Sequence, residues 1–347
     1  MNDESREAKT AVGWAQGALL LTAVVAIAAK TVGVVVAPGA RGVAGESVVV
    51  FLDRASGTLA YTLTALLVAL VCGGSFELAR ARAVNAAARG TVVAVSGLVV
   101  ALASPAVVER LSTAPSVALS VVTSTTALLA GGVVLRAPHT RVLGGVLGLL
   151  GICGLLRVAA WETSAVAFDR ANYALVDVAR GFATAATALQ ALAVLVATAW
   201  VGTRSKWRGR ILANVAILGA FGITWLAARS SPSPSAIEAV LRTSLPAAAG
   251  VPTPYLLQSI AAFLVPASIL LAGAALLQPS RSAVTCALAF ALLSHGAYDV
   301  PLHALLVTTS AQWAMLAMAD DRSRVVRLVR PPEARATSEA TTQNQSA

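Results

Sequence analysis

Charged side chains are scarce in this chain of 347 residues, since Asp, Glu, Lys and Arg together make up only 12% of it. Soluble domains carry about 25% charged residues, so roughly half of the usual polar surface is missing. Hydrophobic residues make up 57% of the chain. This composition excludes an ordinary water-soluble domain and indicates that the partner of most of the surface is the lipid bilayer.

The motifs of common soluble enzymes are also missing. The sequence contains no phosphate-binding glycine loop, no nucleophile elbow and no zinc-binding helix of the His-Glu type. Its three cysteines, Cys72, Cys153 and Cys286, stand singly inside apolar runs and form no CxxC pair. Buried thiols of this kind behave as small hydrophobic side chains, so neither a disulfide framework nor a cysteine metal site is indicated.

Long apolar runs are what the chain does contain. A span needs roughly 20 apolar residues to cross about 30 Å of hydrocarbon, and its backbone groups must form hydrogen bonds within the segment. Such runs predict helices, because barrel strands would appear as short alternating segments, and none occur. We therefore predict an all-α polytopic transmembrane bundle of about ten spans. The predicted spans are 11–29, 57–75, 91–108, 115–135, 142–160, 181–202, 211–228, 254–277, 283–298 and 302–318.

The basic residues between these spans alternate between rich and poor segments. With the N-terminus inside, the inside segments hold most of the 26 Lys and Arg residues, while the acidic residues divide evenly. Basic residues are retained on the cytoplasmic side of a membrane protein, so both termini are predicted to be cytoplasmic, in a bacterial-type inner membrane. Topology also explains the net charge of +10, and no nucleic-acid partner is indicated.

The chain divides into a bundle and two ends. We predict a cytoplasmic N-terminus at 1–10, a transmembrane bundle at 11–318, and a basic juxtamembrane segment with a disordered tail at 319–347. Short outer segments are expected at 38–56, 161–180 and 229–253, either as a small cap over the bundle or as ordinary linkers. The first apolar run is longer than a usual signal-peptide core, which favours an uncleaved anchor, although Val36-Ala37-Pro38 leaves cleavage open.

Glycines recur three and four residues apart in the predicted span 142–160. Gly144, Gly148 and Gly151 would share one face of a helix, and such a smooth face lets a neighbouring helix approach closely. The pattern predicts tight helix packing. A membrane-protein partner or a second copy of the chain that docks through these glycines is a further hypothesis.

Polar residues inside the predicted spans are few. Gln190, Asn214 and Gln312 stand alone in mid-span, where interhelical hydrogen bonds account for them. Ser120 and Thr123 belong to a hydroxyl-rich face that either packs against its own backbone or lines a solute pathway. No acidic or basic residue lies at the centre of a predicted span, and this argues against an ion-coupled carrier or a proton relay.

One cluster has the composition of a site. Residues 294–303 hold two of the three histidines and form the outer turn between the last two predicted spans. On a helix His295 and Asp299 would lie one turn apart on the same face, and His303 would lie in the first turn of the next helix. Two imidazoles and a carboxylate suit zinc or another divalent transition metal, and a metal-bound water would then be the nucleophile. The alternative is a polar knot in which Asp299 caps the helix and pairs with His295.

The segment His295-Gly-Ala-Tyr-Asp299 resembles the last motif of the PrsW-type intramembrane metalloproteases. The resemblance is confined to 294–303 and implies a metal-dependent peptidase with His295 among its metal ligands. The family's Glu-Glu-x-x-Lys motif has no counterpart here, and His139 lies on a predicted cytoplasmic turn rather than in the family's upstream histidine motif. The chain therefore lacks that family's general base and one of its ligands.

Three functions are compatible with these features. A non-catalytic role as membrane partner, sensor or assembly subunit fits best, because no enzyme motif is complete. An intramembrane metal-dependent hydrolase would use Asp299 and His303 as catalytic residues, with His295, Asp299 and His303 as metal ligands. A carrier of small, mostly uncharged solutes is the third hypothesis, and it requires polar residues to converge at mid-membrane depth.

Overall fold

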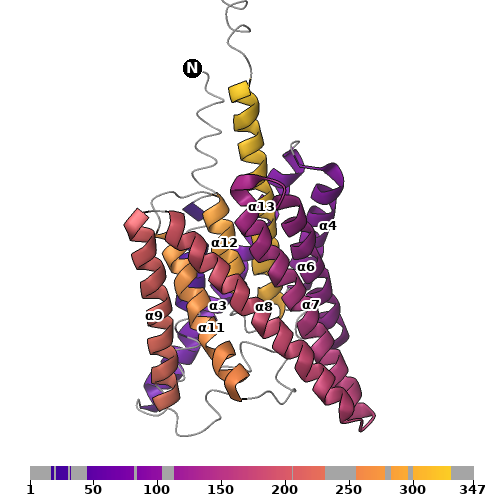
Figure 1. The fold of residues 1–347 in the computed structure, drawn as a ribbon, viewed down its shortest axis with the longest axis vertical. Coiled ribbons are helices and arrows are strands. Elements are labelled where there is room, and N and C mark those ends of the chain that lie inside the picture. The colour runs from indigo at the N-terminus through magenta and orange to yellow at the C-terminus, as the bar shows by residue number, and fades with distance from the viewer. Residues whose placement is uncertain are drawn as a thin grey trace, which may run out of the picture.

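The protein is a bundle of helices. The computed structural model describes residues 17–18, 21–29, 32, 45–81, 84–103, 113–204, 206–230, 255–277, 283–295 and 300–329. Among these residues every regular element is helical, and the helices run side by side along the long axis (Figure 1). The prediction of an all-α fold is confirmed, because strands are absent from the described part of the chain.

The described helices follow the predicted spans closely. Each predicted span from 57–75 onward overlaps one α-helix, and residues 21–29 of the first predicted span are helical as well. In the part of the chain that the structure describes, five helices are long and apolar enough to cross a membrane, namely α3, α6, α7, α8 and α13. The elements are α3 (Glu46–Arg80), α4 (Ala86–Leu102), α6 (Thr113–Val134), η2 (Pro138–Thr140), α7 (Arg141–Asp169), α8 (Ala174–Arg204), α9 (Lys206–Ser230), α11 (Tyr255–Leu276), α12 (Ala283–Ser294) and α13 (Val300–Val329).

The outer segment predicted at 161–180 is largely helix, and so is the described part, 45–56, of the segment predicted at 38–56; residues 38–44 lie outside the described residues. In the structure α3 already begins at Glu46, and 161–180 consists of the end of α7, a short turn and the beginning of α8. Likewise α13 continues to Val329, beyond the predicted span. Hydropathy marks where lipid contact ends, whereas a helix continues into water as long as its backbone bonds are maintained. Residues 231–253 of the third predicted outer segment and the tail from 330 onward lie outside the described residues.

The turn between α7 and α8 has the geometry of a helix terminator. Asn172 N–H donates to Ala167 O at 2.9 Å, and Ala171 N–H donates to Phe168 O at 3.2 Å. This pair of bonds places Ala171 in the left-handed region, with a φ of 50°, where glycine is the usual residue. Asn172 then accepts a hydrogen bond from Ala174 N–H through Oδ1 and caps α8.

Replacing Ala171 by glycine should therefore stabilise the protein. We expect Ala171→Gly to raise the free energy of unfolding by about 0.5–1 kcal/mol, because glycine adopts a positive φ without the steric cost of a Cβ. Denaturant unfolding of the detergent-solubilised protein measures the change. Ala165→Gly, at an exposed position inside α7, is the matched control and should destabilise by a similar amount. Equal destabilisation by both changes would contradict the strain at Ala171.

Helices α12 and α13 form the centre of the bundle (Figure 1). Every residue of α12 from Val284 to Ser294 is buried, and α13 contacts α3, α4, α6, α7 and α12. The helix α9, in contrast, leaves Val215 and Leu218 mostly exposed along one side. Apolar side chains exposed in the middle of a helix of this length are expected where the surroundings are lipid.

Gln312 of α13 links three helices through its side-chain amide. Its Nε2 atom lies 3.1 Å from Val71 O, 2.8 Å from Ser75 Oγ and 2.7 Å from Ser96 Oγ, and its two hydrogens are shared among these three acceptors. Both serine hydroxyls donate to carbonyls of their own helices, so their oxygens accept from the amide. The prediction that Gln312 forms interhelical hydrogen bonds is confirmed, and the bonds join α13 to α3 and α4.

The glycine face of α7 packs against α6 of the same chain. A Cβ atom on Gly144 would lie 2.7 Å from Leu135 N, and one on Gly151 would lie 2.6 Å from Ser124 O. Real Cβ atoms do not approach backbone atoms this closely, so these two positions require glycine for the helices to meet. A Cβ on Gly148 would meet nothing within 4 Å. The predicted tight packing is present within the chain, while docking of a partner through this face stays a prediction.

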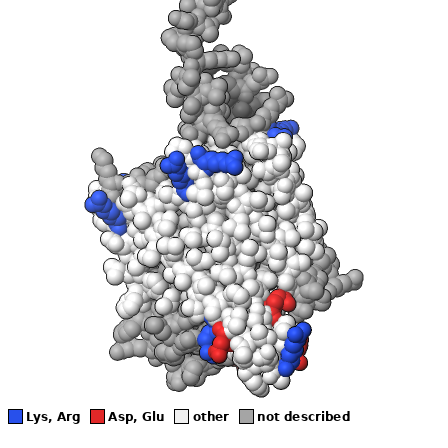
Figure 2. Space-filling model, turned by 45° about the vertical axis from the view of Figure 1, so that its right-hand side comes forward, with Lys and Arg blue, Asp and Glu red and all other residues white. Residues whose placement is uncertain are grey.

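Charges separate to the two ends of the bundle. Figure 2 shows a broad uncharged band between basic residues at the upper end and a mixture of acidic and basic residues at the lower end. We call the end formed by the C-termini of α3 and α8 and the N-termini of α7 and α9 the basic end, and the end with the α7–α8 turn the acidic end. Charged residues whose side chains are described are Arg80, Arg89, Arg136, Arg141, Arg208 and Arg210 with Glu77 at the basic end, and Glu46, Asp53, Glu162, Asp169 and Asp177 with Arg54, Arg170 and Arg180 at the acidic end. The helix ends add Arg204, Lys206, Asp320, Asp321, Arg322, Arg324 and Arg327 to the basic end and Arg229 to the acidic end.

Candidate functional site

Helix α12 ends inside the bundle. It has 12 residues, and a helix of this length rises about 18 Å, which is less than the roughly 30 Å of a hydrocarbon core. The helix begins near the basic end, so its last turn lies within the protein rather than at the opposite surface (Figure 1). Ser294 and His295, at this helix end, are each 1% exposed. The final carbonyl groups of α12 therefore need donors from the protein itself.

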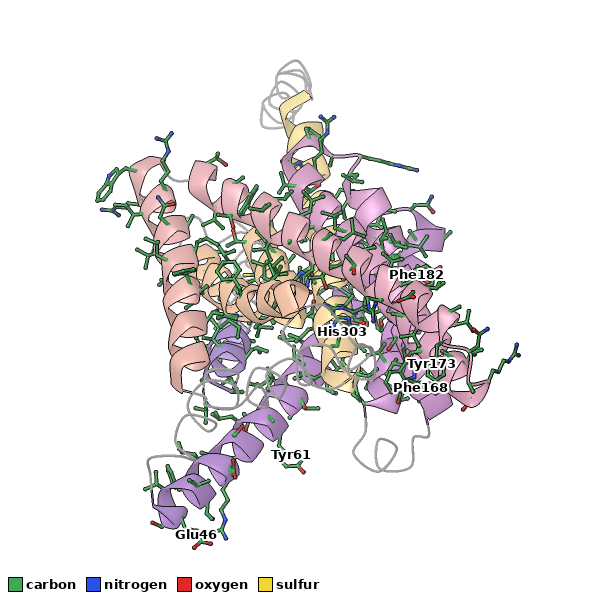
Figure 3. All side chains as sticks on the ribbon, turned by 60° about the horizontal axis from the view of Figure 1, so that its bottom comes forward. Glu46, Tyr61, Phe168, Tyr173, Phe182 and His303 are labelled. Carbon is green, nitrogen blue, oxygen red and sulfur yellow. The ribbon has the colours of Figure 1, made fainter. Side chains whose placement is uncertain are left out.

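His303, in the first turn of α13, supplies one of these donors. Its Nδ1 atom lies 2.9 Å from Ser294 O. A carbonyl oxygen only accepts, so Nδ1 carries the hydrogen in this bond. Seen from the acidic end, His303 lies in the middle of the bundle (Figure 3). The bond closes the α12–α13 hairpin and gives His303 a structural role at the end of α12.

His295 is a buried imidazole without a hydrogen-bond partner. Neither Nδ1 nor Nε2 of His295 has one among the described residues. A buried polar group left unpaired costs about 1–3 kcal/mol, so such groups in folded proteins call for an explanation. Asp299, the predicted partner of His295, lies outside the described residues together with 296–298. The predicted polar knot of His295 and Asp299 therefore involves a residue outside the described ranges, and it stays a prediction.

Arg157 brings a positive charge to this region from α7. Because α7 extends to Asp169, Arg157 lies in the middle third of the helix, about 24 Å from Arg141 along the helix axis at the usual rise per residue. Its Nη2 atom donates to Gln190 Oε1 of α8 in a short hydrogen bond. Its Nε atom is buried and has no hydrogen-bond partner among the described residues. Arg157 lies within electrostatic range of His295, as does His303.

The prediction that no span has a charged residue at its centre stays a prediction. Arg157 lies near the outer end of the predicted span 142–160, while α7 continues to Asp169. Apolar residues flank Arg157 on both sides in the sequence, and the acidic Glu162 that follows is typical of a span end.

We call five residues the buried polar centre: Arg157, Gln190, Ser294, His295 and His303. Hydrogen bonds join Arg157 to Gln190 and His303 to Ser294. Arg157 and His303, which are themselves half-buried, lie within electrostatic range of the buried His295. The five residues come from α7, α8, the end of α12 and the beginning of α13. Within the α7–α8 and α12–α13 hairpins the helices pack extensively, whereas α7 makes only a small contact with α12 and α13. The buried polar centre thus lies at a narrow seam between two hairpins. Sequence analysis found the two histidines and Gln190 but missed Arg157.

The arrangement supplies hydrogen-bond donors and a positive charge. An arginine guanidinium stays protonated in proteins and donates in a fixed, planar geometry. The acidic side chains of the described residues lie at the two ends of the bundle instead. This chemistry suits an anion or a hydrogen-bond acceptor.

The predicted metal site of His295, Asp299 and His303 stays a prediction. Within the described ranges, no group of three His, Cys, Asp or Glu side chains could hold a metal ion, and Asp299 is outside those ranges. Nδ1 of His303 is engaged with Ser294 O. The positive charge of Arg157 beside His295 works against binding of a second cation there.

The hydroxyl-rich face of α6 does not join the buried polar centre. Ser120 Oγ donates to Ser116 O at 2.9 Å, and Thr123 Oγ1 donates to Leu119 O at 2.8 Å. These bonds to the helix's own backbone match the packing interpretation rather than the pathway interpretation. Asn214, the other isolated polar residue of the sequence analysis, is exposed on α9.

The fold and its charge distribution define a class of protein. Several apolar helices of membrane-spanning length, with charges gathered at the two ends, are the features of a helical membrane protein. No family model, curated protein or solved structure matches the chain.

Proposed function

We propose that this chain is a multi-pass protein of a bacterial-type cytoplasmic membrane, with the basic end and both termini on the cytoplasmic side. We propose further that it is a non-catalytic protein that recognises a small solute, as a sensor or carrier does. The buried polar centre is the proposed binding site. The distribution of arginines between the two ends supports the orientation.

The observation that carries this proposal is the proximity of Arg157 to His295 inside an apolar bundle. The ring nitrogens of His295 have no hydrogen-bond partner among the described residues. Ionisable residues within a membrane are costly and are retained where they bind or move a solute. A purely structural role accounts for two bonds, from Arg157 to Gln190 and from His303 to Ser294. It leaves both ring nitrogens of His295 and the Nε atom of Arg157 without a purpose.

The position of the centre also supports recognition of a solute. Membrane carriers place their binding sites between helical repeats and at helices that break within the membrane. Here α12 stops inside the bundle at Ser294, and the seam between the two hairpins runs beside that break. Small movements of one hairpin against the other would open the centre toward the acidic end.

The test is whether water reaches the centre. In a background with Cys72, Cys153 and Cys286 replaced by alanine, Ser294→Cys should react with a small membrane-impermeant thiol reagent added from outside. Ser268→Cys is the matched control, because Ser268 is equally buried and bonds only to its own helix at Leu264 O. It should remain unlabelled. Tyr173→Cys, at the exposed acidic end, should be labelled at once and reports the orientation.

Two results would contradict the proposal. If Ser294→Cys stays as unreactive as Ser268→Cys while Tyr173→Cys is labelled, the centre is a sealed structural crosslink. If Tyr173→Cys reacts only after permeabilisation, the proposed orientation is reversed.

A further inference from the structure

We propose that the buried polar centre binds the carboxylate group of a small monocarboxylic acid with an apolar body, held between Arg157 and His295. The inference rests on the proposed function, since it names the chemical class of the solute. It differs from the solutes suggested by the sequence, which were mostly uncharged.

The charge of Arg157 indicates the charge of the solute. Arg157 is the one described arginine in the middle of a helix, since the others lie at the two ends of the bundle. A single guanidinium in an apolar site is matched by a single negative charge, because any excess charge would remain uncompensated in a medium of low dielectric constant. A carboxylate meets this condition. A phosphate monoester, with up to two charges, requires more positive groups than the centre provides.

The open hydrogen-bond donors of Arg157 and His295 indicate which group of the solute binds there. One arm of Arg157 is engaged with Gln190, which fixes the guanidinium, while its Nε–H has no partner among the described residues. A neutral imidazole offers one N–H donor, and His295 has neither nitrogen engaged within the described ranges. Two donors from different helices match the two oxygens of one carboxylate. Arg157 Nε and the ring nitrogens of His295 are not hydrogen-bonded to each other, so both groups can donate to a third.

The apolar surroundings of the buried polar centre indicate the nature of the rest of the solute. The residues of α12 that precede the centre are apolar and fully buried, Phe290, Leu292 and Leu293 among them. An amino acid would bring an ammonium group next to Arg157, and the five residues of the buried polar centre include no acidic side chain to receive it. A sugar acid would leave its hydroxyls unpaired against these side chains. Simple aliphatic and aromatic monocarboxylates remain.

The experiment measures binding to the full-length protein in lipid nanodiscs. Titration calorimetry with sodium butyrate and sodium benzoate should show binding, while butyramide, benzamide and inorganic phosphate should not bind. The amides have nearly the same shape without the charge. Arg157→Gln should weaken carboxylate binding by about 10- to 100-fold, because it removes a charge-assisted hydrogen bond. Arg141→Gln, at the basic end, is the control and should bind like the unaltered protein.

A second variant tests the inference if Arg157→Gln does not fold. If Arg157→Gln fails to elute as a monodisperse protein, Arg157→Lys keeps the charge and should bind with an intermediate loss, because lysine lacks the planar two-donor geometry. Equal affinity for the acids and the amides, or for butyrate and phosphate, would overturn the inference.

The chain's own Asp299 is the competing occupant. It follows His295 by one helical turn in sequence. If the unaltered protein binds no carboxylate but Asp299→Asn does, the centre is filled internally and the inference is wrong. Labelling of Ser294→Cys distinguishes failure of this inference from failure of the proposed function. If the cysteine reacts but no carboxylate binds, only the proposed class of solute is wrong. If the cysteine does not react, the proposed function is wrong as well.

Discussion

Gly151→Ala should destabilise the bundle by about 1–3 kcal/mol, the usual cost of adding a methyl group to a packed interior. The new Cβ would lie 2.6 Å from Ser124 O and 2.6 Å from Leu128 Cγ, both on the facing helix α6. The carbonyl is a backbone atom and cannot rotate away, so α6 and α7 would have to separate. Thermal unfolding in a mild detergent should show the loss directly.

Gly148→Ala is the matched control. It makes the same change in the same helix, but its Cβ would meet nothing within 4 Å. We expect no loss of stability, and a small gain is consistent with the better helix propensity of alanine. If Gly148→Ala destabilises as much as Gly151→Ala, contact with α6 is not the cause, and a partner or second copy on the glycine face becomes the explanation.

Gln312→Met should lower the free energy of unfolding by about 1–2 kcal/mol, which is in the upper range measured for polar contacts between membrane helices. Methionine keeps the length of the side chain but removes three bonds, to Val71 O, Ser75 Oγ and Ser96 Oγ. The effect stays moderate for two reasons. Both serines keep their bonds to their own helices, and Gln312 Oε1 has no partner among the described residues.

Thr309→Val provides the comparison for Gln312→Met. Thr309 is as deeply buried in α13, but its hydroxyl donates only to Leu305 O of the same helix. Its replacement should cost less than Gln312→Met, because no link between helices is lost. Combining Gln312→Met with Ser96→Ala should add less than the sum of the separate effects, since the two residues share a bond. Full additivity would show that the link contributes nothing.

Tight contacts hold the helices around the buried polar centre in place. Helix α6 is fixed to α7 through Gly144 and Gly151, and α13 is fixed to α3 and α4 through Gln312. Because α6 also packs extensively against α13, it joins the two hairpins, whose direct contact with each other is small. These packing contacts offset the cost of the unpaired groups of His295 and Arg157.

Hydropathy alone was sufficient to predict the class of fold and the approximate place of its helices. The runs from 57–75 to 302–318 each overlap one helix of the structure. This works because the transfer of each residue from water to lipid contributes nearly independently, so that the sum over a window depends on composition and hardly on neighbours. Helix ends were predicted less well, since the helix of α7 continues past Glu162 into the region where charges are tolerated.

The neighbours of each helix could not be derived in this way. Nothing in the run 283–298 distinguishes α12, which is short, central and surrounded by protein, from a helix exposed to lipid, because lipid and a protein interior favour the same side chains. The same holds for Arg157, which the sequence places near a span end and the packing of α7 against α8 places beside Gln190 and His295. The composition of each segment determines whether it is buried in an apolar medium or exposed to water. Which segments distant in sequence become neighbours depends on how their side-chain surfaces fit together, and that fit is defined only in the packed bundle.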